Sequence, residues 1–273
     1  MRREVASITK MMTFYTVICI MDEYKIDPKK TLIAVSRMGS SVSGTTAELR
    51  EGDVLSLYQL FFAMMLPSGN DAAFTLGEYF GEFIRTEKYN FKHSDKIFGN
   101  IHLSPFYQHP TMKYFLREMN LNAQKLNMFD TYYDSPHGLR NERNFSTAYD
   151  VALLTNECMK IPLFRQVVGT GYIETRSLGN QVAMRNFHER KLTQYRWEST
   201  NKLLGCLDGL IGCKTGITTA AGPCFAGYYE ADGLKLAVIL CCSRSMEIRW
   251  MEIQRLVAYV KSAVAKYNQM RDM

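Results

Sequence analysis

Apolar residues at helical spacing dominate the first part of the chain. In the clearest stretch, Met112, Phe115, Met119 and Leu126 lie roughly on one side of a helix. A Pro-Ser-Gly break at residues 67–69 separates two other helical stretches. We predict helices at residues 7–24, 55–66, 71–83 and 111–127, and a further helix that begins after the capping side chains of residues 144–147 and runs to residue 159.

The last third of the chain changes to short apolar runs separated by turn residues. Asp232-Gly233 stands between two such runs, which is a strong signal for a β-hairpin. A short run at residues 31–36 also has strand character, and an amphipathic helix is expected at residues 246–267. The other predicted strands are residues 171–175, 210–215, 224–230 and 234–241.

The order of these elements predicts a mixed α/β protein of the α+β kind. Helices come first, antiparallel strands follow, and a helix ends the chain, so we expect an antiparallel sheet flanked by helices and a mostly helical lobe. The length of 273 residues suits one domain. We assign residues 1–273 to it, with a helical lobe at roughly 37–165, a sheet lobe at roughly 1–36 and 166–273, a Gly/Ser/Thr-rich loop at 39–46 and a loop insertion at 86–110.

The composition argues against some classes of function but does not identify the function. The chain is 47% hydrophobic and 22% charged, as in ordinary soluble domains, and its net charge of +6 is modest. No run of Lys and Arg stands out, so we expect no nucleic-acid partner. Seven cysteines without a C-x-x-C pair predict buried thiols, and five histidines without ligand spacing predict no metal site. We also expect no organic cofactor, and the sequence leaves the oligomeric state open.

The N-terminus has two interpretations. Residues 1–10 are basic and residues 11–21 are apolar, which is the pattern of a signal peptide. However, Asp22 and Glu23 follow directly without a small-residue cleavage site, and eleven apolar residues are too few to span a bilayer. We therefore predict a buried core helix and no transmembrane segment.

The first candidate motif is Ser7-Ile8-Thr9-Lys10. Residues three apart on a helix share a face, so the Lys10 amine can approach the Ser7 hydroxyl. A serine hydroxyl needs a base before it becomes a strong nucleophile. Lys10 can be that base only if its pKa falls through burial or a nearby cation. Taken alone, the spacing is more typical of a helix start followed by a surface lysine.

The second motif is Ser68-Gly69-Asn70, between two predicted helices. A loop at that point can aim one hydroxyl and one amide into a cleft. Ser68 can then relay a proton to a departing amine, and Asn70 can hold the Lys10 amine and a substrate amide. The tripeptide alone is also an ordinary turn with a helix cap.

The third motif is Lys214-Thr215-Gly216, at the end of a predicted strand. Lys214 supplies positive charge, and the Thr215 hydroxyl can bond a carboxylate. Gly216 is expected to leave room for a substrate strand against the sheet edge, and the backbone N–H of Ile217 to face the carbonyl under attack. A strand that ends in a Thr-Gly turn is the alternative without function.

Together the three motifs resemble those of serine β-lactamases and penicillin-binding proteins. The chain is most similar to the low-molecular-mass serine D-Ala-D-Ala carboxypeptidases, over nearly all of residues 5–260 apart from residues 86–110. The segments that carry this resemblance are residues 6–13, 65–73, 119–126, 131–139, 146–150, 200–204, 208–218 and 221–222.

The resemblance implies a fold of the β-lactamase/DD-peptidase kind, with the active site between the sheet and the helical lobe. The reaction it implies is peptide hydrolysis through an acyl-serine. Ser7 is expected to be acylated by a peptide ending in D-Ala-D-Ala, or by β-lactam inhibitors, and Lys10 to be the base. It also implies that Lys214 and Thr215 bind the terminal carboxylate, and that the N–H groups of Ser7 and Ile217 form the oxyanion hole. His137, in a Pro-His-Gly-Leu setting, is predicted to be a structural turn rather than a catalytic histidine.

Members of this family normally carry a signal peptide, so we expect an extracytoplasmic protein. They also carry sheet-forming segments ahead of the nucleophile. Only six residues precede Ser7 here, so we expect the sheet to lack an edge. Some members also carry a C-terminal β-rich domain and a membrane anchor. Two alternatives stay open. One is a class A β-lactamase, since residues 118–122 match its E-x-x-L-N segment by letter, although Gly69 departs from the usual Asp. The other is a non-catalytic protein that binds cell-wall peptide or a partner.

Overall fold

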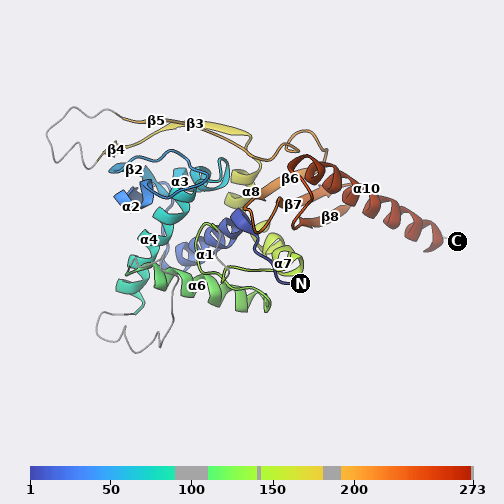
Figure 1. Ribbon diagram of the computed structural model, residues 1–273, viewed down its shortest axis with the longest axis horizontal. Coiled ribbons are helices and arrows are strands. Elements are labelled where there is room, and N and C mark those ends of the chain that lie inside the picture. Colours follow the sequence, from blue (N-terminus) through green and yellow to red (C-terminus); the bar gives the residue numbers. More distant parts are fainter. Residues whose placement is uncertain (90–109, 140–142, 181–191, 272–273) are drawn as a thin grey trace.

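A buried helix forms the centre of the protein in the computed structural model, which describes residues 1–89, 110–139, 143–180 and 192–271 (Figure 1). A short 3₁₀ turn, η1 (Ala6–Ile8), leads into helix α1 (Thr9–Tyr24). The Phe14 ring of α1 stacks on Phe61 at 4.0 Å between centroids and meets Phe164 edge-on at 5.0 Å. The apolar run at residues 11–21 is therefore interior, which confirms the predicted core helix.

Four helices surround α1. They are α3 (Leu57–Met65), α4 (Asn70–Glu87), α6 (Met112–Lys125) and α7 (Ala148–Cys158), and each packs against it. Thr147 caps α7 by accepting a hydrogen bond from the Asp150 N–H, as the capping residues predicted. Most of the predicted insertion at residues 86–110 lies outside the described residues, and its first two residues complete α4.

The main sheet has three antiparallel strands in the order β6 (Leu210–Gly216), β7 (Cys224–Ala231) and β8 (Leu234–Leu240). Asp232 and Gly233, both at positive φ, close the predicted hairpin between β7 and β8. Helix α10 (Met246–Arg271) packs Ile253 and Val257 against this sheet, and its far end projects with the C-terminus (Figure 1). These strands and this helix confirm the α+β prediction for the last third.

Several short elements differ from the prediction. Strand β2 (Asp53–Ser56) occupies the start of the stretch expected to be helical from residue 55. The predicted strand at 31–36 is β1 (Leu32–Ala34), and it joins a different sheet from the one expected, since it pairs with β2 and not with β6–β8. The elements that the sequence did not predict are α2 (Arg37–Ser40), α8 (Pro162–Val168), β4 (Gly179–Asn180), which pairs with β2, and β5 (Gln194–Glu198), which pairs with β3 (Tyr172–Arg176).

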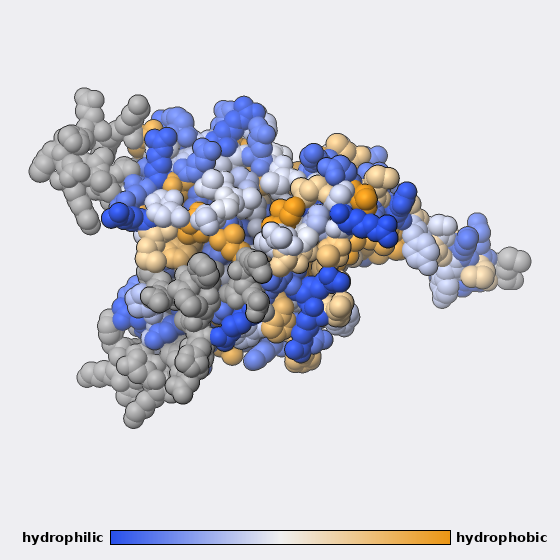
Figure 2. Space-filling view, viewed as in Figure 1, coloured by the Kyte–Doolittle hydropathy of each residue, from blue (hydrophilic) through white to orange (hydrophobic). Residues whose placement is uncertain are grey.

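Hydrophilic and apolar residues are interspersed over the face drawn in Figure 2, which is ordinary for a protein whose most apolar helix is internal. Across the described ranges, none of the helices combines the length and apolar character needed to cross a membrane.

A buried carboxylate fixes the loop that precedes the site. Asp71, in the first turn of α4, accepts hydrogen bonds from the backbone N–H groups of Ala47, Leu49 and Ala72, and from the Thr46 hydroxyl. The carboxylate is 1% exposed. The same loop reaches the second motif, because the Thr45 hydroxyl donates to the Ser68 carbonyl at 2.7 Å. Asp71 therefore holds residues 45–49 against the start of α4.

We expect Asp71→Asn to lower the free energy of unfolding by about 2–3 kcal/mol, because charge-assisted bonds are lost and an amide group faces backbone donors. Urea denaturation measures this. Asp22→Asn, at an exposed position of α1, is the control and should change stability by less than about 0.5 kcal/mol. An unchanged unfolding midpoint in Asp71→Asn contradicts the role of this carboxylate.

Candidate active site

Ser7 and Lys10 meet at the start of α1. Ser7 belongs to the 3₁₀ turn and Lys10 to the first turn of the α-helix. The Lys10 Nζ atom lies 2.8 Å from the Ser7 Oγ atom, which is hydrogen-bond distance. The three-residue spacing thus brings the amine to the hydroxyl as predicted, and Ser7 stays partly exposed while Lys10 is fully buried.

The Lys10 amine has two further oxygen partners. Its Nζ atom lies 2.6 Å from the Asn70 Oδ1 atom and 3.0 Å from the His137 carbonyl oxygen. Asn70 is held in turn by donating to the Ser43 carbonyl at 2.8 Å. Burial holds the pKa of Lys10 well below its ordinary value, the positive charge of Lys214 lowers it further, and Asp71 offsets part of this shift. A neutral amine that can accept a proton from Ser7 is therefore favoured.

The turn that presents Ser7 is seated on a glycine. Ala6 has a φ of 49°, an uncommon left-handed conformation for a non-glycine residue. Gly138, itself at φ 76°, lies so close that a Cβ atom there would stand 1.9 Å from the Ala6 carbonyl oxygen. Only glycine fits this contact, so Gly138 lets the 135–139 segment pack directly on the turn that contains Ser7.

Both the backbone and the ring of His137 form hydrogen bonds inside the protein. Its carbonyl oxygen accepts from Lys10, and its Nδ1 atom accepts from the Leu139 N–H at 3.1 Å. Burial, with Lys10 nearby, lowers the pKa of His137 to about 3, so the ring is neutral. This supports the prediction of a structural turn.

Ser68 lies at the junction of α3 and α4 with a φ of 68°. Such a strained conformation in a buried serine is typical of functional positions. Its neighbour Gly69 donates to the Ala63 carbonyl at 3.1 Å, and a Cβ at Gly69 would stand 2.6 Å from that oxygen. The backbone thus holds Ser68 two residues before Asn70, whose side chain contacts the Lys10 amine.

Lys214 lies buried on β6, close enough for its charge to lower the pKa of Lys10. Its Nζ atom donates to the Thr215 carbonyl at 2.9 Å. Burial and then the charge of Arg249 lower the pKa of Lys214 to about 7. The Thr215 hydroxyl lies 2.7 Å from the hydroxyl of Thr200, a residue that the motif analysis did not single out as functional. Ile217, next along the chain, is 49% exposed at the end of the strand.

Gly216 has a different neighbour from the one expected. The sequence predicted room for a substrate strand at this glycine. Instead, a Cβ atom at Gly216 would stand 2.8 Å from the Val5 carbonyl oxygen and 3.1 Å from the Ser7 backbone nitrogen. The space is filled by the protein's own chain. Gly216 therefore brings the Ser7 turn against β6, which places the third motif beside the first.

Arg249 is a site residue that sequence reasoning missed. It comes from α10, is 1% exposed, and donates through Nη1 to the carbonyls of Cys224 at 3.1 Å and Gly216 at 3.4 Å. Its guanidinium lies 4.2 Å from the Trp250 ring centroid. Its Nε atom is buried without a hydrogen-bond partner among the residues that the structure describes. An arginine inside an amphipathic helix gives no signal of this position in sequence.

Glu118, the residue that matched the β-lactamase pattern, is used elsewhere. Its carboxylate accepts from the Lys88 Nζ atom at 3.0 Å and from the Tyr89 hydroxyl at 2.9 Å. It is 5% exposed on α6. This carboxylate ties α6 to the end of α4, which is a structural role.

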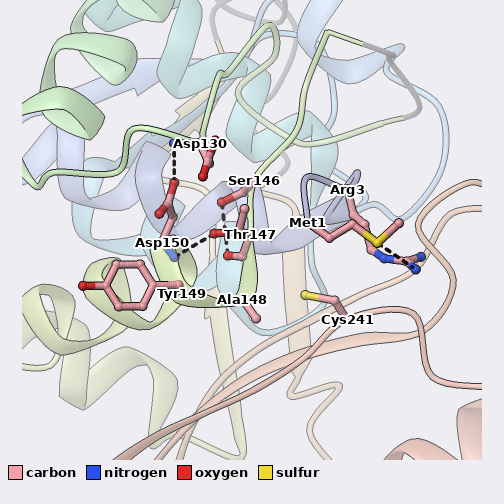
Figure 3. Close-up of a pocket in the computed structure, with 9 residues that line it drawn as sticks. All are labelled: Met1, Arg3, Asp130, Ser146, Thr147, Ala148, Tyr149, Asp150 and Cys241. Atoms are coloured by element: carbon pink, nitrogen blue, oxygen red, sulfur yellow. Dashed lines mark hydrogen bonds between the residues drawn. The ribbon is translucent and has the colours of Figure 1, made fainter.

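A separate cavity of about 460 Å³ lies along the N-terminal residues (Figure 3). Within the described residues, its lining includes Arg3, Asp130, Asp150 and Cys241 but none of the motif residues. In the same described part of the chain, no three His, Cys, Asp or Glu side chains gather as metal ligands do.

Comparisons with known proteins agree with the motifs. The family described as D-alanyl-D-alanine carboxypeptidase matches residues 1–85 and 110–242. The chain is similar to the D-alanyl-D-alanine carboxypeptidase of Streptomyces sp. (strain K15), with 27% identity over 94% of this chain and 79% of that protein. It is also similar to the D-alanyl-D-alanine carboxypeptidase DacD of Escherichia coli (strain K12), with 28% identity over 81% of this chain and 47% of that protein.

Among solved structures, the chain is similar to the crystal structure of the Streptomyces K15 DD-transpeptidase. The TM-score is 0.76 with 25% identity, and the match covers 94% of this chain and 87% of that one. The chain thus spans most of the Streptomyces proteins and about half the length of the Escherichia coli relative.

We expect Gly216→Ala to slow covalent labelling by a fluorescent penicillin at least about tenfold, because the new methyl group pushes the Ser7 turn away from β6. The measurement is the labelling rate of folded protein. Gly171→Ala is the matched control, since nothing lies within 4 Å of a Cβ at that position. A wild-type labelling rate in Gly216→Ala would show that the close contact is not needed.

Proposed function

The chain belongs to the D-alanyl-D-alanine carboxypeptidase family, and we propose that it hydrolyses the last peptide bond of chains ending in D-Ala-D-Ala through an acyl-Ser7 intermediate. The observation that carries this proposal is the 2.8 Å contact between the Ser7 hydroxyl and the buried Lys10 amine. A buried amine with a lowered pKa is the base that a serine nucleophile requires.

In the acylation step, the Lys10 Nζ atom takes the hydroxyl proton as the Ser7 Oγ atom bonds to the carbonyl carbon of the penultimate D-Ala. The N–H groups of Ser7 and Ile217 receive the negative charge on the carbonyl oxygen; each such donor is typically worth about 3–4 kcal/mol. The C–N bond then breaks, and the departing amine of the terminal D-Ala gains a proton through Ser68. Water releases the acyl group in the second step, with Lys10 again accepting the proton.

The substrate's terminal carboxylate is proposed to bind at the end of β6. Lys214 supplies the charge, and the Thr215 hydroxyl supplies a hydrogen bond. Arg249, buried behind Gly216, adds a second fixed positive charge. A β-lactam carries a carboxylate and a strained amide, so we propose that it enters the same way and acylates Ser7. The expected place of action is outside the cytoplasm.

The two alternatives have less support. A class A β-lactamase would need Glu118 near the acyl group, and this carboxylate is bonded to Lys88 and Tyr89. A protein that only binds peptide has no use for a base placed on a nucleophile. We therefore keep hydrolysis by acyl-Ser7 as the function.

We expect wild-type protein to gain the mass of one β-lactam, mapped to Ser7, and Ser7→Ala to gain none, because only the hydroxyl can form the ester. Intact-protein mass spectrometry followed by peptide mapping measures this, together with release of D-Ala from a D-Ala-D-Ala peptide. Ser41→Ala, at an exposed position, should behave as wild type. A folded wild type that stays unlabelled refutes the enzyme, and rapid loss of the adduct favours the β-lactamase.

The pH profile of kcat/KM is expected to be bell-shaped. It rises as Lys10 loses its proton, at a pH lowered by burial and by Lys214, because only the neutral amine can accept the Ser7 proton. It falls as pH passes the pKa of Lys214, about 7 in the free enzyme, because the strand edge loses its cation. These limits belong to a coupled pair.

The Lys214→Arg variant distinguishes the acid limb of the pH profile from the alkaline limb, because a guanidinium stays charged at high pH. The alkaline limb should move to higher pH while the acid limb remains. Rates of D-Ala release across the pH range measure both. An alkaline limb unchanged by Lys214→Arg excludes Lys214 as its source.

A further inference from the structure

Three cysteines meet at one end of the β7–β8 pair, next to the site. Cys224 begins β7, and the register that pairs Phe225 with Leu240 continues to place Cys224 opposite Cys241. Cys242 follows at φ 59°, and its N–H donates to the Cys224 Sγ atom at 3.5 Å. The extra residue makes a local bulge at this end of the strand pair, where the Ser243 N–H donates to the Pro223 carbonyl at 2.9 Å.

The geometry of Cys224 and Cys241 suits a covalent bond. Directly opposed residues in antiparallel strands have Cα atoms about 4.5–5.5 Å apart. A disulfide spans Cα distances of about 4.4–6.8 Å. Cys224 is buried and Cys241 half-buried, and each thiol shifts the pKa of the other.

The surroundings make the two thiols unequal. The hydrogen bond from Cys241, the N–H of Cys242 and the charges of Arg249 and Arg3 lower the pKa of Cys224. The same hydrogen bond, together with burial, raises the pKa of Cys241. By contrast, burial in apolar surroundings raises the pKa of Cys158 and Cys213. The pKa of Cys224 is thus shifted in the direction that favours reaction, and that of Cys241 in the opposite direction.

A path leads from solvent to this pair. Cys241 and Arg3 line the cavity of about 460 Å³, and Figure 3 shows the Cys241 side chain at its edge. A molecule as small as hydrogen peroxide fits such a cavity, and Arg3 provides positive charge there. Cys241 thus lies between this cavity and the buried Cys224.

We propose that Cys224 and Cys241 are a redox-modification site that a hydroperoxide converts into a reversible cross-strand disulfide. The Cys224 thiolate attacks one peroxide oxygen, the O–O bond breaks, and Cys224 becomes a sulfenic acid as hydroxide leaves and is protonated to water. The Cys241 sulfur then attacks the Cys224 sulfur, loses its proton and expels a second water. Two thiols lose two electrons, and one hydrogen peroxide becomes two waters.

The site does not rest on the proposed hydrolysis, although it lies close to it. Cys224 pairs directly with Gly216 across β6 and β7, and its carbonyl accepts from Arg249. A disulfide here ties β8 to the strand that supports the third motif.

The test treats the reduced full chain with a small excess of hydrogen peroxide and maps the products by mass spectrometry. We expect the intact mass to fall by two hydrogens, two of the seven thiols to resist alkylation, and one cross-linked peptide pair to contain Cys224 and Cys241. A phosphine reductant should restore both thiols. No cross-link, or a cross-link that joins Cys224 to Cys242, overturns the proposal.

Substitutions of single cysteines test which two sulfur atoms form the bond. Cys241→Ser should abolish the cross-link and let dimedone trap the sulfenic acid on Cys224. Cys242→Ser and Cys206→Ser, which change the two exposed cysteines, should both retain the cross-link. If Cys241→Ser does not fold, the peptide pair formed in the wild type still decides the question. A dimedone adduct on Cys206 in place of Cys224 contradicts the proposed reactivity.

Discussion

Burial of one lysine amine is the constraint on which the rest of this structure depends. The Lys10 Nζ atom is removed from water at the point where α1, α4 and the 135–139 segment meet. An unpaired ammonium in such a place is costly, so the amine needs oxygen partners and favours its neutral form. Ser7, Asn70 and the His137 carbonyl provide those partners. The packing that buries the amine therefore also favours the neutral form that its proposed role as a base requires.

The pKa values of Lys10 and Lys214 are each lowered by another buried cation. Arg249 lowers the pKa of Lys214, and Lys214 in turn lowers the pKa of Lys10. Arg249 lies on α10, Lys214 on β6 and Lys10 on α1, so the series links the sheet with the central helix. Like charges that are buried together raise the cost of folding. A bound carboxylate at the strand end repays part of that cost, which is a physical reason for the site to prefer an anionic terminus.

The sequence correctly predicted features that depend only on residues close together in the chain. The three-residue spacing of Ser7 and Lys10 needs only a helical turn, and Asp232-Gly233 needs only a hairpin, and both are as predicted. Strand β5 was missed although its alternating polar and aromatic residues, with Tyr195 and Trp197 buried, are a local strand pattern. Arg249 was missed because its partners are distant in the chain. Its role comes from carbonyls 25 and 33 positions away in the chain, and no local pattern encodes those contacts.

Two glycines explain how distant motifs come to act on one atom. Gly138 supports the Ala6 carbonyl on one side of the nucleophile turn, and Gly216 receives the Val5 carbonyl and the Ser7 nitrogen. Contacts of this kind join backbone to backbone, so no side-chain rotamer can loosen them. The strained φ of Ala6 costs about 1–3 kcal/mol and persists because both contacts hold it. The position of Ser7 is thus set by the absence of two side chains, which makes Gly216 part of the nucleophile's support.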